Sequence, residues 1–123
     1  MITYAERVCF SEAHLRLLSR VETYVVRVSN TWGNELRCHE LARAVHLVIA
    51  CEHAIVVDGK CGPIEHSWIY LSDGVILDPY VPGRLPAVQL IDLVVGTAYR
   101  PGPMRSDIRQ AVVDQLVREM RGI

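Results

Sequence analysis

The spacing of apolar residues changes partway along the chain, and this change limits the folds that the sequence can adopt. From residue 11 to about residue 50, apolar side chains recur at steps of three and four positions, which is typical of amphipathic helices. After Cys51 the apolar runs are short, rich in β-branched residues and interrupted by turn-forming sequences. The pattern therefore predicts helices first and a sheet afterwards.

Two helices are expected in the first part of the chain. The first is predicted over residues 11–29, with Ser11 as its N-cap, and the second over about residues 35–50, with Asn34 as its N-cap. The second helix would carry Cys38 in its first turn, on the same side as its apolar positions. We therefore expect the Cys38 side chain to face the buried side of this helix.

The rest of the chain predicts a small sheet and one more helix. Strands are expected at residues 54–57, 64–71 and 75–80. Residues 88–95 could be strand or helix, with a strand favoured at the end of that range, and an extended stretch or turn follows at 99–103. The first strand is predicted to end at the turn sequence Asp58-Gly59. A last helix would begin after Ser106 as its N-cap and stop at Gly122. This order indicates an α+β fold, with helices packed on a small antiparallel sheet.

Composition limits the classes of protein to consider. The chain has 123 residues, half of them hydrophobic, and a formal net charge of −1, so we expect a single domain over 1–123. Its arginines are scattered, which argues against nucleic acid and anionic membranes as partners. No apolar run reaches the ~18 residues of a membrane span. The N-terminus lacks a signal-peptide pattern, which favours a cytoplasmic protein or one exported without a classical signal peptide.

Three residues have side chains suited to thiol chemistry. A cysteine is a nucleophile as its thiolate, which a helix N-terminus and a nearby imidazolium both stabilise. Cys38 is predicted to have the first, and His66 on a strand would supply the second. Asp78 on the next strand could orient that histidine.

The loop between these strands decides whether His66 and Asp78 can meet. With a two-residue turn at Asp73-Gly74 they would lie on opposite faces of the sheet. With a three-residue loop that has Gly74 in the left-handed conformation, Trp68 pairs with Asp78 and all of these side chains share one face. Glycine is the residue that this loop requires at its third position.

The segment Cys38 … His66-Ser67-Trp68 … Leu77-Asp78-Pro79-Tyr80 resembles the core of the papain-like and transglutaminase-like cysteine hydrolases. The resemblance covers residues 34–80, about the middle third of the chain. It departs from the family pattern in the residues after the cysteine, His39-Glu40, and in the short hairpin. It implies a cysteine that begins a helix, packed on an antiparallel sheet that carries the histidine and the aspartate.

The resemblance also implies acyl transfer through a thioester on a peptide or protein amide, as in a peptidase, amidase, deamidase or transglutaminase. Cys38 would attack the carbonyl, His66 would move the proton, and Asp78 would orient His66. The oxyanion would be held by the Cys38 backbone N–H and by an upstream side chain, with Trp32, Asn34 and Asn30 as candidates. The residues expected to line the site are His39, Trp68 and Tyr80.

Other interpretations of the same residues stay open. Each of Cys38, His66 and Asp78 alone is more often an ordinary packing or turn residue. The spacing after His39 does not match a zinc peptidase, and Cys51, His53 and Cys61 contain no tight ligand pair, so neither metal nor cofactor is expected. The alternative function is a binding protein that keeps this fold without turnover, such as a phage or bacterial accessory factor. A homo-oligomer or a protein partner could then supply substrate recognition.

Overall fold

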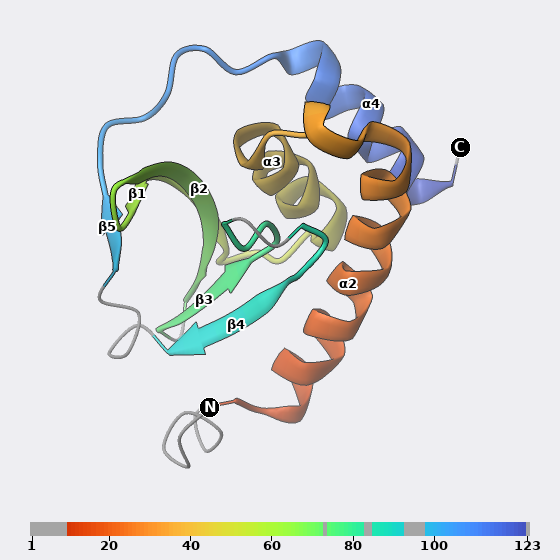
Figure 1. The fold of residues 1–123 in the computed structure, drawn as a ribbon. Helices are drawn as coiled ribbons and strands as arrows, with labels where there is room; N and C mark the ends of the chain where they lie inside the picture. The colour runs from red at the N-terminus through yellow and green to blue at the C-terminus, as the bar shows by residue number, and fades with distance from the viewer. Residues whose placement is uncertain (1–9, 73, 83–84, 93–97, 123) are drawn as a thin grey trace.

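The computed structural model describes residues 10–72, 74–82, 85–92 and 98–122. Within them the chain forms three α-helices and one five-stranded antiparallel sheet, which confirms the predicted α+β class (Figure 1). The helices are α2 (Glu12–Trp32), α3 (Cys38–Ile49) and α4 (Gln110–Arg121), with a short 3₁₀ turn η1 (Gly33–Glu35). The strands are β1 (Ile55–Cys61), β2 (Ile64–Leu71), β3 (Val75–Asp78), β4 (Gln89–Asp92) and β5 (Tyr99–Pro101).

The first helix begins where the sequence predicts. The Ser11 hydroxyl accepts a hydrogen bond from the His14 backbone N–H at 3.1 Å, and the His14 ring accepts one from the Ser11 N–H at 3.1 Å. Histidine thus completes a capping box in which Glu or Gln is usual. One side of α2 is fully buried through Val21, Val25 and Val28, so this helix is fixed by both its cap and its packing.

The second helix begins later than predicted, at Cys38, and its N-cap is Arg37 rather than Asn34. Asn34 lies within η1, and Leu36 then takes an extended conformation and is buried. The extended, buried Leu36 therefore ends η1 and keeps η1 from continuing directly into α3. As a result Cys38 is the first helical residue, closer to the positive end of α3 than the sequence indicated.

The hairpin between β2 and β3 has the predicted three-residue register. Ile69 pairs with Leu77 and Leu71 with Val75, and Gly74 has a left-handed φ of 81°. The two-residue alternative is therefore wrong. Asp73 itself lies outside the described residues.

The prediction that the first strand ends at Asp58-Gly59 is also wrong. Strand β1 continues through both residues to Cys61, and the turn lies at Gly62-Pro63, because Cys61 pairs with Ile64. Asp58 is tolerated inside a strand because an arginine neutralises it, as described below. Gly59 is needed there because a Cβ would lie 2.1 Å from the Arg100 carbonyl oxygen of β5.

The strand order is β4-β3-β2-β1-β5, and the sheet curls so that its two faces have different roles (Figure 1). One face carries Ile69, Leu71 and Leu77, which join the main core formed with the three helices. The other face carries a smaller apolar cluster of Trp68, Ile76 and Tyr99. His66 and Asp78 alternate with the core residues and therefore belong to this second face.

The C-terminal helix also starts later than predicted, after Arg109 rather than after Ser106. It ends at Gly122 as expected, where a left-handed φ of 76° allows the glycine N–H to bond Arg118 and Glu119 carbonyls. The range 88–95 contains a strand, as favoured, but β4 lies near its start and not at its end; residues 93–97 are outside the described ones. No helix in the described ranges is long and apolar enough to cross a membrane.

Candidate active site

His66 and Asp78 meet across the β2–β3 hairpin. Nε2 of His66 lies 2.9 Å from Oδ2 of Asp78, and the two side chains are 2% and 0% exposed. The predicted register is what brings them to the same face. The contact leaves Nδ1 as the ring nitrogen of His66 that is free to face another group.

The Asp78 carboxylate is held from several directions. Oδ2 accepts a second hydrogen bond, from the Tyr99 hydroxyl at 2.6 Å, while Oδ1 accepts one from the Tyr80 backbone N–H at 3.0 Å. Gln89 in turn donates to the Tyr99 oxygen at 2.8 Å. These contacts fix the carboxylate and therefore the plane of the His66 ring. Tyr99 and Gln89 were not identified from sequence, since no local pattern links them to Asp78.

The charge state of His66 follows from its partners. Burial alone lowers the pKa of His66, but the hydrogen bond to Asp78, followed by the influence of Cys38 and the negative charge of Asp78, outweighs it and raises the pKa to about 9. His66 is therefore an imidazolium at neutral pH. Cys38 and His66 line the same cavity, and Asp78 contacts His66 from behind it.

Cys38 lies at the mouth of a surface cavity. This cavity has a volume of about 330 Å³ and is lined by residues of three segments: Leu36, Arg37, Cys38, His39, Ile64, Glu65, His66, Tyr80 and Pro82. The thiol is half-buried, and no side chain caps the N-terminus of α3 in the described structure. The first-turn N–H groups have no partner inside the helix, so they are available to a ligand or to water.

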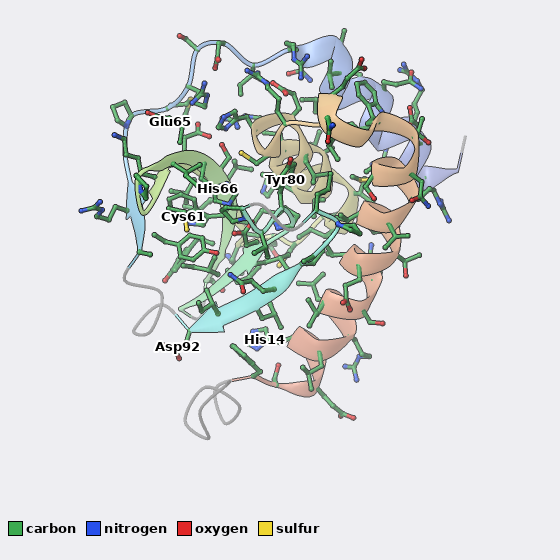
Figure 2. All side chains as sticks on the ribbon, viewed as in Figure 1. His14, Cys61, Glu65, His66, Tyr80 and Asp92 are labelled. Atoms are coloured by element: carbon green, nitrogen blue, oxygen red, sulfur yellow. The ribbon has the colours of Figure 1, made fainter. Side chains whose placement is uncertain are left out.

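Aromatic side chains cover the far side of the His66–Asp78 pair. The Trp68 ring stacks near His66 with centroids 6.0 Å apart, and Tyr99 lies edge-on to Trp68 at 5.2 Å. Tyr80 lines the cavity as expected, and His66 and Tyr80 both lie near the middle of the molecule (Figure 2). Burial, followed by the negative charge of Cys38, raises the pKa of the Tyr80 hydroxyl. Aromatic side chains therefore shield one side of the site from water, while the other side faces the cavity.

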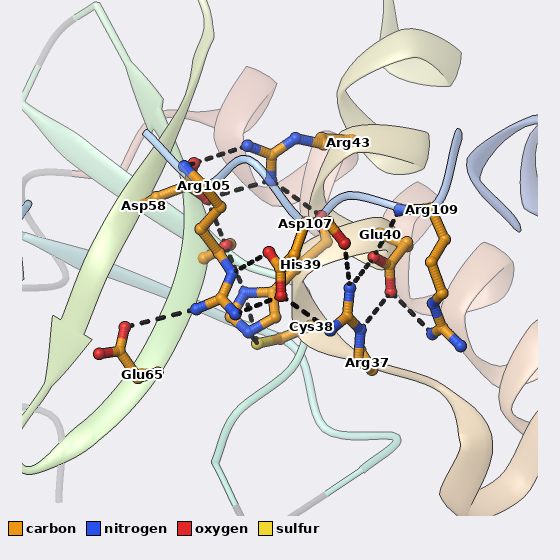
Figure 3. A network of polar contacts seen from close by, with 11 residues as sticks. Arg37, Cys38, His39, Glu40, Arg43, Asp58, Glu65, Arg105, Asp107 and Arg109 are labelled. Carbon is orange, nitrogen blue, oxygen red and sulfur yellow. Dashed lines mark hydrogen bonds and ion pairs between the residues drawn. The ribbon is translucent and has the colours of Figure 1, made fainter. Parts of the chain in front are cut away.

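A second histidine contacts the same sulfur. Nδ1 and Nε2 of His39 lie 3.5 Å and 3.9 Å from Sγ of Cys38, and Nδ1 also lies 2.7 Å from Oγ of Ser67 (Figure 3). Burial lowers the pKa of His39, and the charges of Arg105 and Arg37 lower it further against the opposing effects of Glu40 and Asp107. At neutral pH the His66 ring therefore carries a positive charge, whereas the His39 ring is neutral.

Ser67 connects His39 to a buried ion pair. The Ser67 hydroxyl donates to Oδ1 of Asp58 at 2.5 Å, and Arg43 donates to the two Asp58 oxygens at 3.0 and 2.6 Å. Burial raises the pKa of Asp58, but these donors and the Arg105 backbone N–H outweigh it and lower the pKa to about 2. Asp58 is thus a carboxylate that can only accept hydrogen bonds.

Charged side chains form a network beside the cavity, which Arg37 and Glu65 line (Figure 3). Asp107 bridges Arg37 and Arg105, with contacts of 3.3 and 2.8 Å, and Arg105 also contacts Glu65 at 3.4 Å. Glu40 is fully buried beside Arg37 and Arg109, whose hydrogen bonds outweigh its burial and lower its pKa to about 2. This network ties the start of α3 to the segment before α4.

The side chains expected to complete the oxyanion site lie elsewhere. The Trp32 indole N–H donates to Oε1 of Glu119 at 2.9 Å, so it does not face Cys38. Asn34 and Asn30 line a separate cavity of about 450 Å³, on the other side of Tyr80. These expectations are corrected because η1 turns this segment away from the start of α3.

Two further cysteines lie within the described residues, and neither forms a disulfide. Cys51 and Cys61 are free thiols, of which Cys51 is exposed, while Cys9 lies outside the described residues. Burial, followed by the charge of Asp78, raises the pKa of Cys61. Within the described ranges, no group of three or more His, Cys, Asp or Glu side chains has a metal-binding arrangement.

Comparisons with protein-family models, curated proteins and solved structures found no match to this chain. The resemblance to papain-like and transglutaminase-like hydrolases stays a prediction from its residues.

Proposed function

We propose that this protein catalyses thiol-dependent acyl transfer on a peptide or protein amide. The observation that carries the proposal is the arrangement of Cys38, at the first residue of a helix, beside an imidazolium that Asp78 holds at 2.9 Å. A thiolate is stabilised in such a place by the helix N-terminus and by the adjacent positive charge. The open cavity gives a carbonyl group access to the sulfur.

The reaction would proceed in two halves. The Cys38 thiolate adds to the amide carbonyl, the C–N bond breaks, and His66 gives its proton to the leaving nitrogen, which leaves a thioester on Cys38. Water or an amine then attacks the thioester and releases the thiolate. Backbone N–H groups of the first turn of α3 would stabilise the oxyanion in each half.

Selective alkylation tests the reactive thiolate. We expect iodoacetamide at pH 6 to label Cys38 faster than the exposed Cys51, and a His66→Gln variant to lose this preference, with mass spectrometry to locate each adduct. Cys51 is the internal control because it is more accessible. Labelling of Cys38 no faster than Cys51 in the wild-type protein would contradict the proposal.

Turnover separates an enzyme from a binding protein of the same fold. A library of peptide amides incubated with the wild-type protein should give acyl adducts on Cys38 and released ammonia or amine, and a Cys38→Ala variant should give neither. A reactive Cys38 without any adduct or release across the library, together with a full biological effect of Cys38→Ala, would favour the binding function instead.

A further inference from the structure

The Ser67 hydroxyl determines which nitrogen of His39 carries the proton. Asp58 is ionised and can only accept, so the single Ser67 proton is donated to it. The Ser67 oxygen must then accept its 2.7 Å hydrogen bond from His39, which places the proton of the neutral ring on Nδ1. Nε2 is therefore left with an unprotonated lone pair.

The ring that carries this lone pair lies beside the reactive sulfur. Nε2 is 3.9 Å and Nδ1 3.5 Å from Sγ of Cys38, and in the part of the chain that the structure describes no donor other than Cys38 lies within hydrogen-bond distance of Nε2. His39 also lines the cavity that opens over Cys38. The carbonyl carbon of a thioester is bonded directly to Sγ, so an acceptor that attacks it passes within reach of Nε2.

From this geometry we propose that His39 is the general base for the acyl acceptor in the second half of the reaction, an inference that rests on the function proposed above. The acceptor, water or an amine, gives a proton to Nε2 of His39 as its oxygen or nitrogen bonds to the carbonyl carbon. The C–S bond then breaks and Cys38 leaves as a thiolate. The proton on His39 then passes through solvent to His66, which restores the neutral His39 ring and the charged His66 ring.

In this proposal His66 and His39 act in different halves of the reaction. His66 starts as the charged ring, gives its proton to the leaving group and serves the first half. His39 starts neutral and serves the second. Ser67, Asp58 and Arg43 are positioning residues that keep the proton of His39 on Nδ1.

Acetyl transfer from p-nitrophenyl acetate separates the two halves, because its leaving group needs no proton. Wild-type protein should release p-nitrophenol in a burst of one mole per mole of Cys38, followed by steady turnover. His39→Asn keeps an amide N–H near the position of Nδ1 but has no basic nitrogen. We expect it to keep the burst, to lose about 10²-fold or more in steady turnover, and to accumulate acetyl-Cys38 by mass.

Two further variants complete the test. His46→Asn removes a histidine of the same helix that contacts the Ala54 carbonyl at 2.7 Å, and it should turn over like the wild-type protein. Ser67→Ala keeps the His39 ring but frees its proton to move to Nε2, so it should slow turnover while the burst remains. This variant carries the test if His39→Asn does not fold.

The outcomes distinguish the two proposals. Absence of any burst in the wild-type protein would overturn thiol-dependent acyl transfer itself. A wild-type burst together with unchanged steady turnover in His39→Asn would overturn the role of His39 alone. Loss of the burst in a folded His39→Asn variant would also overturn it, because His39 would then act in the first half.

Discussion

The Tyr99 hydroxyl donates to Oδ2 of Asp78 at 2.6 Å, and this is the same oxygen that contacts His66. Tyr99 comes from β5 at one edge of the sheet, whereas Asp78 lies on β3. The side chain therefore crosses the curled face to reach the carboxylate. Through this contact the orientation of His66 depends on a strand that is distant from it along the chain.

Tyr99→Phe tests this contact with little change in packing. The ring keeps its place against Trp68, but Asp78 loses a donor and the Gln89 amide loses its acceptor. We expect a loss of about 1–3 kcal/mol in the free energy of unfolding, measured by urea denaturation. Tyr70→Phe is the control because its hydroxyl makes no hydrogen bond among the described residues. Equal stability of the two variants would contradict the prediction.

Asp78→Asn tests the charge of the same group. The amide has a similar shape but no negative charge, so burial should dominate and the pKa of His66 should fall from about 9 to near or below its ordinary value. NMR titration of the His66 ring measures this directly, and acyl transfer should fall by about 10²–10⁴-fold. Asp114→Asn, on α4, is the matched control. An unchanged His66 titration would be inconsistent with the role given to Asp78.

The geometry of the hairpin could be predicted because it depends on local chemistry. A glycine at the third loop position selects one register, and that register alone places His66 and Asp78 on one face. The start of α3 was predicted three residues too early because a single sequence does not show that Leu36 is buried. Local signals in the sequence therefore predict the His66–Asp78 pair, whereas tertiary packing determines the position of Cys38 in its helix.

The contacts that link Arg43, Asp58, Ser67 and His39 were not predicted, for a different reason. Asp58-Gly59 has the sequence of a turn, but Arg43 from α3 neutralises Asp58 and allows it to lie inside β1. Asp58 and Ser67 are paired across the β1–β2 hairpin, whereas the contact from Ser67 to His39 reaches a helix 28 residues earlier in the chain. No periodicity or motif in one sequence reports such a contact. The oxyanion candidates failed similarly, since Trp32 binds Glu119 on α4.

Stability should fall as the pH rises from near neutral. The pKa of His66 is about 9 in the folded protein and 6.5 as its ordinary value, so the folded state binds more protons between these values. The contribution of the pair is complete below pH 6.5 and is lost as the pH rises through about 9. Urea denaturation from pH 6 to 10 should show this loss in the wild-type protein but not in His66→Gln. Parallel curves for the two proteins would show that the assignment is wrong.

Arg43→Met should destabilise the protein strongly because it leaves Asp58 buried without its bidentate partner. We expect a cost of about 3–5 kcal/mol at pH 7 by chemical denaturation. The folded pKa of Asp58 is about 2, below its usual 3.8, so this contribution is present above pH 3.8 and is lost as the pH falls through 2. The difference between wild type and variant should therefore shrink in acid.

The control for this change is Arg16→Met. Arg16 pairs with Glu12 at 3.8 Å, and both side chains are mostly exposed, so the expected cost is at most about 1 kcal/mol. A similar cost for the two variants, or a difference that does not depend on pH, would contradict the special role of the Arg43–Asp58 pair.

Gly59→Ala should separate β5 from β1 and thereby disturb the candidate site without touching it. The new Cβ would lie 2.1 Å from the Arg100 carbonyl oxygen, so one of the two strands must move. Because β5 carries Tyr99, the movement should withdraw the Tyr99 hydroxyl from Asp78 and change the titration of His66. We expect a loss of about 1–3 kcal/mol in unfolding free energy, together with a shifted His66 titration by NMR.

Gly102→Ala is the matched control, since its Cβ would meet its nearest neighbour at 3.4 Å, an ordinary contact. If Gly59→Ala lowers stability but leaves the His66 titration unchanged, then Asp78 holds His66 without help from β5.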